Sequence, residues 1–346
     1  MYIISAFDIR MSDIRLNLIK AWLELELKLN PHNIHPASGD ASFRRYFRFG
    51  DIQRSYIVMD APPEQEDIAP FARIARALKS IGINAPEIVA EEKNHGFLLL
   101  SDLGKQLYLD ELSEDNANSL YQRAIDALVL MQRSRTTLEN DIPPYDRSLL
   151  LNEMMLFRDW LLQKHLQLSL NHHHETTLLD HFDYLATAAL SQPDTFVHRD
   201  YHSRNIMHIE NSPPGILDFQ DAVIGPVCYD LVSLLKDCYI AWPRQQTLNW
   251  CQYYFDNAQE AGILLHCEFQ QFIMWFDLMG VQRHLKASGI FARLYHRDGK
   301  DGYLKDIPRT LNYIVELKGL YPQLTQLITL IENDMLPLLM EKQTHG

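Results

Sequence analysis

The stretch that decides the fold is HRDYHSRN, residues 198–205, because it gathers two histidines, two arginines, an aspartate and an asparagine into eight residues. Two interpretations compete. In the first, His198, Asp200 and His202 alternate as the ligands of a metal cluster. In the second, Asp200 and Asn205 are the two working residues of a loop that transfers a phosphoryl group.

The residues after this stretch favour phosphoryl transfer. NIMHIE (205–210) and GILDF (215–219) read as two short strands around a Ser-Pro-Pro turn, and a hairpin of this kind places Asn205 beside Asp218. Kinases combine H-R-D-x-x-x-x-N with a following D-F. The aspartate accepts the proton of the attacking hydroxyl, while the asparagine and the second carboxylate offer oxygen ligands to Mg²⁺ on the phosphates of ATP. We therefore predict Asp200 as the base and Asn205 and Asp218 as Mg²⁺ ligands.

The metal-cluster interpretation uses fewer of these residues. A metal hydrolase gives Asn205 no role, and it places Arg199 and Arg204 beside a dication. The downstream segment GILDFQDA (215–222) supplies carboxylates but no further histidine. A metal-dependent hydrolase therefore remains a third possibility, behind a kinase and a non-catalytic nucleotide-binding protein.

Length and composition indicate an ordered two-lobed protein. The chain has 346 residues, of which 47% are hydrophobic, and its net charge is −13. An acidic chain lacks the basic surface that nucleic acid requires. The four cysteines form no CxxC pair, and no apolar segment suggests a signal peptide or a membrane span. We expect a cytoplasmic monomer with reduced core thiols, acting on a small molecule and binding neither nucleic acid nor a membrane.

The chain divides into a small lobe and a larger helical one. A helix is expected from about 12 to 30, and then strands ASFRRYFRF (41–49) and RSYIVMD (54–60), a helix over 68–82, and strands PEIVAEE (86–92) and GFLLLSD (96–102). Amphipathic helices are expected after that, over 111–137, 147–168, 175–191, 227–240, 244–262, 266–288 and 305–340. The prediction from this pattern is an α+β, bilobal fold. Its α/β N-lobe with an antiparallel sheet covers 1–101, and its mainly helical C-lobe covers 102–346.

The loop and the segment after it resemble the aminoglycoside phosphotransferase/choline kinase family, whose loop often reads H-G-D-x-H-x-x-N. Tyr201-His202 fits that pattern. Further stretches resemble the anomeric sugar kinases of cell-wall recycling, which phosphorylate the C1 hydroxyl of N-acetylmuramate and N-acetylglucosamine. They are ASGDASFRRYFR (37–48), VMDAPPE (58–64), FLLLSDLG (97–104), LDFQDAVIGPVCYDLVSLLKDCYIAWP (217–243) and GVQRHLKASGIFARL (280–294).

The resemblance implies a protein-kinase-like fold, with an ATP cleft between the two lobes and a hinge at 99–104. It also implies ATP and Mg²⁺ as cofactors and a set of nucleotide contacts. The loop Ser38, Gly39, Asp40, Ala41 and Ser42 would cover the phosphates. The hinge residues Leu99, Ser101, Asp102 and Leu103 would contact adenine through their backbone, and Leu217 would form an apolar floor.

The sequence departs from the family at one position. Kinases carry a lysine at the end of the third strand, but the matching stretch of this chain offers Met59 or Asp60. The charge on the phosphates would then be neutralised by Arg44, Arg45 or Arg48, or chiefly by Mg²⁺. This departure motivates the alternative of a non-catalytic, pseudokinase-like nucleotide-binding protein.

The remaining predicted residues either support the catalytic loop or bind the substrate. His198 and Asp230 are expected to be structural, with Asp230 capping a helix and holding the catalytic loop. The predicted sugar contacts are His202, Arg204, Asp221, Arg283 and His284, with Arg283 meeting the lactyl carboxylate of muramate. The polar group around 282–286 is alternatively a solvated helix surface. The alternative acceptors are an aminoglycoside or another small alcohol.

Overall fold

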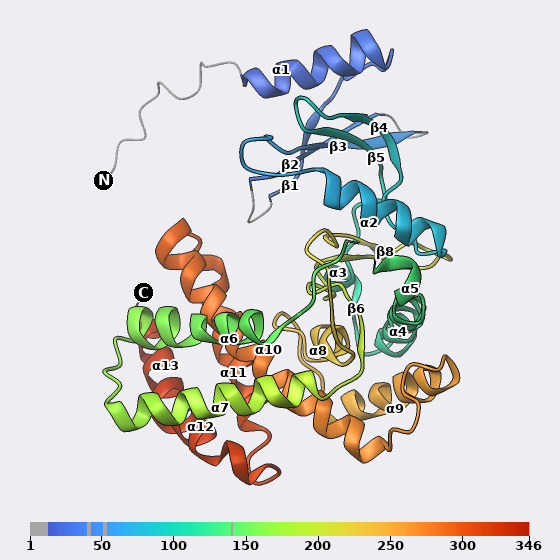
Figure 1. Cartoon of the computed structure of the whole chain (residues 1–346). Helices are drawn as coiled ribbons and strands as arrows, with labels where there is room; N and C mark the ends of the chain where they lie inside the picture. Colours follow the sequence, from blue (N-terminus) through green and yellow to red (C-terminus); the bar gives the residue numbers. More distant parts are fainter. Residues whose placement is uncertain (1–12, 40–42, 51–53, 140, 346) are drawn as a thin grey trace. The chain divides into compact units, whose positions relative to one another are not determined.

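The computed structural model describes residues 13–39, 43–50, 54–139 and 141–345 (Figure 1). The chain separates into two compact units, Met1–Gly104 and Lys105–Gly346. Each unit has its own buried residues and is described by itself.

A five-stranded antiparallel sheet forms the centre of the N-terminal unit, with strand order β1-β2-β3-β5-β4. The strands are β1 His35–Gly39, β2 Arg45–Gly50, β3 Ser55–Asp60, β4 Ile88–Glu92 and β5 Phe97–Ser101. Figure 1 shows helices α1 (Ile14–Ala21) and α2 (Ala69–Ser80) on opposite sides of this sheet. Both predicted hairpins and the predicted helix between them are confirmed.

The sequence of β5 explains why both faces of the sheet are covered. Phe97 and Leu99 of β5 point into a core with Trp22 and Val58, while Leu98 and Leu100, on the opposite face, are equally buried. A strand that is buried on both faces needs a continuous apolar run, which FLLLS supplies.

Two predictions for the start of this unit were wrong in detail. The expected helix to about residue 30 is α1 followed by a short π-helical segment, η1 (Trp22–Glu26). Ser38 and Gly39, expected in a loop, belong to β1, an edge strand that pairs with β2 and has an irregularity between Pro36 and Ser38. Proline is tolerated on an edge strand, where its missing N–H leaves no ladder bond unmade.

Two small ribbons position the loop after residue 197 in the C-terminal unit. Strand β6 (Asp194–Val197) pairs with β9 (Val223–Pro226), and β7 (Ile206–Met207) pairs with β8 (Gly215–Ile216). The predicted hairpin of 205–219 is confirmed, and β9 is an additional strand.

Helices make up the rest of this unit (Figure 1). They are α3 Tyr108–Glu111, α4 Ala117–Arg133, α5 Arg135–Leu138, α6 Arg147–Leu156, η2 Phe157–His165, α7 His172–Leu190, α8 Tyr229–Leu235, α9 Arg244–Glu260, α10 Phe269–Asp298, η3 Asp301–Asp306, α11 Ile307–Val315, η4 Pro322–Leu324, α12 Thr325–Leu330, η5 Ile331–Met335 and α13 Leu336–His345. The expected helix over 266–288 continues to Asp298. The expected single helix over 305–340 is wrong, since Gly319 (φ 81°) and Pro322 interrupt it.

Helix α10 is the central helix of the unit and packs against α6, η2, α7, α8, α11 and η3. Gly289 permits its close approach to the start of η2, because a Cβ there would lie 2.4 Å from the backbone carbon of Leu156. This contact fixes the face of α10 that carries residues 282–286.

All four cysteines are free and buried, as the sequence indicated. Among the described residues, no helix combines the length and the apolar character that crossing a bilayer requires.

Candidate active site

The β7–β8 hairpin brings together the three residues predicted for phosphoryl transfer. The N–H of Leu217 donates to the carbonyl of Asn205 at 3.0 Å. The side-chain amide of Asn205 donates to Asp218 Oδ2 at 3.1 Å and to the carbonyl oxygen of Asp200 at 3.0 Å. One amide group therefore joins the middle of the loop to the strand that follows it.

These side chains fit a magnesium ion. The amide nitrogen of Asn205 is occupied by the two bonds above, which leaves its oxygen as the atom for a metal. Asp218 accepts through Oδ1 from Gln220 at 2.8 Å and contributes a carboxylate beside Asn205. Mg²⁺ is commonly held by one or two such oxygen ligands together with substrate phosphates and water.

The histidines of the loop do not form the alternative metal cluster. His198 is fully buried, and its Nδ1 accepts from the N–H of Asp200 at 3.3 Å. Burial lowers the pKa of His198 to about 4, so its ring is neutral and packs against Tyr201 and Phe219. In the part of the chain that the structure describes, no group of three or more His, Cys, Asp or Glu is placed to hold a metal.

Two non-glycine residues of the site have left-handed backbone conformations, Arg199 (φ 76°) and Asp218 (φ 64°). Such conformations cost about 1–3 kcal/mol each and persist where surrounding contacts enforce them. The related loops often carry glycine where this chain has Arg199. The conformation of Arg199 is enforced here by bonds to its backbone and to its side chain.

Asp230 makes the backbone bonds. Its two carboxylate oxygens accept from the N–H groups of His198 (2.6 Å) and Arg199 (3.0 Å). Burial raises the pKa of Asp230 to about 7 against the opposing effect of these two donors. The N-cap of α8 is Cys228, and Asp230 lies inside the helix. Its carboxylate therefore serves the loop rather than the helix end.

Asp237 holds the other end of the loop, and sequence reasoning missed it. Its Oδ2 accepts from the N–H of Ser203 (2.9 Å) and from the Ser203 hydroxyl (2.6 Å), while its Oδ1 accepts from the N–H of Tyr239 (2.9 Å). Asp230 and Asp237 both belong to the segment around α8. This one segment therefore holds the loop on each side of Asp200.

Glu153 of α6 holds the side chain of Arg199, and it too was missed. It is 5% exposed and lies 2.5 Å from Arg199 Nη2 and 2.9 Å from Lys286 Nζ. Tyr145 and Gln282 also donate to it. A single buried carboxylate thus joins α6, the catalytic loop and α10.

The charges around Asp200 favour its ionised form. Burial alone would raise the pKa of this half-buried carboxyl. The charge of Lys286 and then those of His202, Arg283 and Arg199 outweigh burial and hold the pKa below its ordinary value. Asp200 is therefore a carboxylate at neutral pH, as a proton acceptor must be.

The polar group on α10 lies in the interior, so its interpretation as a solvated helix surface is wrong. Gln282, Arg283, His284 and Lys286 are all buried. The Nε2 of His284 lies 2.9 Å from the carbonyl of Lys236, and its ring stacks on Tyr313. These side chains have partners inside the unit, and Arg283 contributes its charge near Asp200.

The other predicted sugar contacts lie in or next to the loop. The ring of His202 packs edge-on against Tyr239, and within the described residues its Nδ1 has no hydrogen-bond partner. The guanidinium of Arg204 stacks on Tyr239 at 3.7 Å from the ring centroid. Asp221 is exposed, and its carbonyl accepts from Arg199 at 3.3 Å.

The predicted nucleotide contacts are placed as follows. Ser38 and Gly39 belong to β1, and Asp40, Ala41 and Ser42 lie outside the described residues. Leu99 is buried, whereas Leu103 and Leu217 are half-buried. Ser101 accepts from the N–H of Glu87 at 2.8 Å through its hydroxyl. The carboxylate of Asp102 accepts from Arg48 (2.7 and 2.9 Å), Ser55 and Gly104, so it has a structural role within its unit.

Where kinases carry the strand lysine, this chain has a buried aspartate with two arginine partners. Asp60 is fully buried and pairs with Arg15 (2.6 Å) and Arg45 (2.5 Å). Arg48 is paired with Asp102. The Nε of Arg44 lies 3.9 Å from Glu66 Oε2. All three arginines considered for the phosphates are thus already paired with carboxylates.

Comparison with known proteins gives a consistent picture. Residues 33–263 match the phosphotransferase enzyme family. A protein from Pseudomonas putida named N-acetylmuramate/N-acetylglucosamine kinase is 44% identical over 330 residues, covering 92% of this chain and 96% of that protein. A protein of the same name from Pseudomonas aeruginosa is 44% identical over 325 residues, covering 91% and 95%.

Among solved structures, the GDP complex of aminoglycoside 2'-phosphotransferase-IIIa superposes with a TM-score of 0.60 at 14% identity, covering 86% of this chain and 99% of that one. At this identity the likeness concerns the fold, and it confirms the predicted kinase-like fold.

Proposed function

The chain belongs to the phosphotransferase enzyme family, and we propose that it transfers the γ-phosphoryl group of ATP to the C1 hydroxyl of N-acetylmuramate or N-acetylglucosamine during peptidoglycan recycling. The observation that carries the proposal is the assembly of Asp200, Asn205 and Asp218 by one amide group and one hairpin. The names of relatives that match almost the whole chain support the acceptor.

In the proposed mechanism, Asp200 orients the sugar hydroxyl and accepts its proton as the oxygen attacks the phosphoryl group. The lowered pKa of Asp200 keeps it ionised for this task. An anomeric hydroxyl is more acidic than an ordinary alcohol, so a carboxylate is a sufficient base. General base catalysis of this kind contributes about 10²–10⁴-fold, and the rest of the acceleration comes from positioning and charge stabilisation.

Asn205 and Asp218 would hold Mg²⁺, which neutralises charge on the phosphates of the bound nucleotide. Their mutual hydrogen bond keeps the two oxygen ligands on one side of the hairpin. The supports from Asp230, Asp237 and Glu153 hold the loop in its strained conformation. A reacting group held by rigid supports loses little freedom on reaching the transition state.

The proposal also includes contacts with the phosphates and the adenine of ATP. The segment 38–42 would approach the phosphates, and backbone groups of 99–103 together with Leu217 would contact adenine. Because Asp60 replaces the strand lysine and Arg45 and Arg48 are paired with carboxylates, Mg²⁺ would carry most of the charge neutralisation.

A panel assay tests this function. ATP consumption is measured with N-acetylmuramate, N-acetylglucosamine, choline and an aminoglycoside, each with and without Mg²⁺. The proposal expects Mg²⁺-dependent consumption with the two amino sugars. Consumption only with the aminoglycoside or choline would contradict the acceptor. Nucleotide binding without consumption for any acceptor would support a pseudokinase, and phosphate release without ATP would support a hydrolase.

A further inference from the structure

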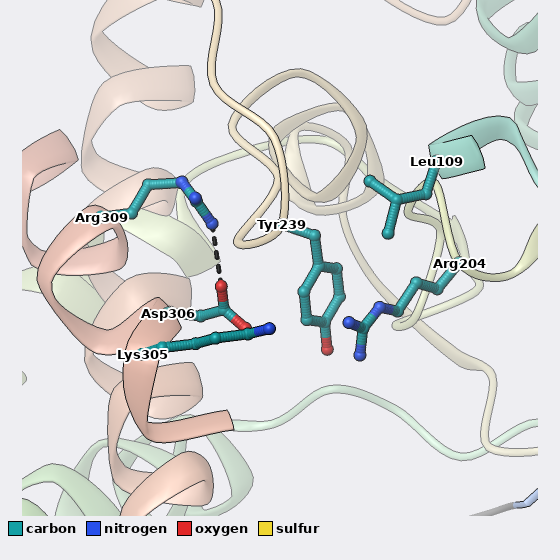
Figure 2. A pocket seen from close by; sticks show the side chains of 6 residues that line it. All are labelled: Leu109, Arg204, Tyr239, Lys305, Asp306 and Arg309. Carbon is teal, nitrogen blue, oxygen red and sulfur yellow. Dashed lines mark hydrogen bonds and ion pairs between the residues drawn. The ribbon is translucent and has the colours of Figure 1, made fainter. Parts of the chain in front are cut away.

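A pocket of about 370 Å³ lies in the C-terminal unit and is lined by Leu109, Arg204, Tyr239, Lys305, Asp306 and Arg309. Figure 2 shows Lys305 and Arg204 extending from opposite sides toward the ring of Tyr239. Its volume is at the lower end of the range of small-molecule sites.

The pocket is continuous with the catalytic loop. Arg204 lies four residues after Asp200, a separation that an extended chain spans in at most about 14 Å. Tyr239 is tied to the same loop, because its N–H and Ser203 share the carboxylate of Asp237. These ties keep the pocket beside the loop that carries Asp200.

The charge of the pocket is positive. Three of the lining side chains are cationic and one is a carboxylate. That carboxylate, Asp306, is paired with Arg309 at 2.9 Å, and its Oδ2 is buried without a partner among the described residues. Two cations, Arg204 and Lys305, are thus left for a ligand, together with one oxygen able to accept from a hydroxyl group.

Arg204 is prepared to bind an anion. Its guanidinium lies 3.7 Å from the ring centroid of Tyr239 and 5.7 Å from that of Tyr303. Within residues 13–39, 43–50, 54–139 and 141–345, neither Arg204 nor Lys305 makes a hydrogen bond or ion pair with a protein group. Stacking orients the planar guanidinium while leaving its N–H donors available, and that fork matches a carboxylate.

We propose that this pocket is the subsite for a carboxylate on the acceptor sugar, with Arg204 and Lys305 as the residues that select an anionic sugar over a neutral one. The inference rests on the proposed function and gives the lactyl carboxylate of N-acetylmuramate its place. The contact with this carboxylate, predicted from the sequence for Arg283, is assigned to Arg204 instead, because Arg283 is only 6% exposed. A polycationic aminoglycoside would meet like charges here.

The test uses the full-length protein with Arg204→Gln and Lys305→Gln, and Lys164→Gln as a control that removes an equal charge from an exposed site outside the pocket. For each variant, kcat and KM are measured with N-acetylmuramate and with N-acetylglucosamine. Far-UV circular dichroism and thermal unfolding check that each variant is folded.

We expect each pocket variant to lower the ratio of kcat/KM for N-acetylmuramate to that for N-acetylglucosamine by about 10-fold or more, the size of one charge-assisted hydrogen bond. The loss appears mainly as a higher KM for N-acetylmuramate. Lys164→Gln leaves the ratio at the wild-type value.

An unchanged ratio in both pocket variants, with both sugars still phosphorylated, would overturn the subsite and leave the proposed function standing. If Arg204→Gln abolishes turnover of both sugars, the ratio in Lys305→Gln decides, because Lys305 is exposed and outside the loop. Absence of phosphorylation of both sugars by the wild-type protein would overturn the proposed function and the subsite together.

Discussion

Replacing Glu153 by glutamine tests the support that the structure gives to the catalytic loop. The change keeps the shape of the side chain and removes the negative charge that Arg199 (2.5 Å) and Lys286 (2.9 Å) share. Two cations are then left around a neutral, buried amide. Removing one partner of a buried ion pair costs about 3–5 kcal/mol. In a unit of this size, 1 kcal/mol changes Tm by about 2–4 °C, so we expect a decrease of about 6–20 °C.

The matched control is Glu175→Gln, since Glu175 pairs with Arg158 at 3.5 Å and its side chain is 41% exposed. Exposed pairs contribute about 0–1 kcal/mol, so Tm should change by no more than about 4 °C. Scanning calorimetry on the wild-type protein and both variants gives the comparison. Equal Tm changes for the two variants would refute the argument that Glu153 supports the loop through its buried charge.

The effect of Glu153→Gln should also depend on pH. Burial raises the pKa of Glu153, but the charges of Lys286 and Arg199 outweigh burial and hold it below the ordinary value. A carboxyl whose folded-state pKa is lowered contributes stability above its unfolded pKa of about 4.3, and that contribution is lost as the pH falls through the folded-state pKa. The Tm difference between wild type and variant should therefore be full at neutral pH and shrink below about pH 4. A difference that grows on acidification would contradict the assigned sign.

Three further changes test the site and the packing that supports it. Asp200→Asn should reduce kcat by about 10²–10⁴-fold while nucleotide affinity, measured by calorimetry, stays near the wild-type value; near-normal turnover would remove Asp200 as the base. Asp218→Ala should weaken Mg²⁺-dependent ATP binding by about 10-fold or more, because a carboxylate ligand is lost, and an undiminished affinity would count against the assignment. Gly289→Ala should destabilise the protein by about 1–3 kcal/mol in denaturant titrations, since the new Cβ meets the backbone of Leu156 at 2.4 Å. Gly302→Ala, which meets nothing within 4 Å, is its control, and an equal effect of both would contradict the packing argument.

The predicted catalytic residues came together because local geometry connects them. Asn205 and Asp218 are separated by a short hairpin, and the pairing of Ile206 with Ile216 places them side by side. Spacing along the sequence therefore carries the information, and the same holds for the two hairpins of the N-terminal sheet.

The supports of the loop escaped prediction because their partners are distant in the sequence. Glu153 is 46 residues from Arg199, and Asp237 is 34 residues from Ser203. In the sequence, each is an ordinary acidic residue in or after an amphipathic helix. Only the packing of α6 and of the segment around α8 against the loop gives them partners.

Two predictions about the C-terminal unit were wrong for different physical reasons. The break in the expected helix over 305–340 was signalled by Gly319 and Pro322, whose turn chemistry outweighed the apolar periodicity. The burial of residues 282–286 had no such signal. Arg283 and Lys286 are polar residues on a helix that other helices surround, and their carboxylate and aromatic neighbours come from other elements.

Phosphorus NMR of the reaction product tests the central claim most directly. The wild-type protein is incubated with ATP, Mg²⁺ and N-acetylmuramate or N-acetylglucosamine, with Asp200→Asn as the control. The proposed function predicts a glycosyl-1-phosphate whose phosphorus is coupled to the anomeric proton, formed by the wild-type protein and nearly absent with the variant. A phosphate at C6, or ADP formed without any sugar phosphate, would contradict it.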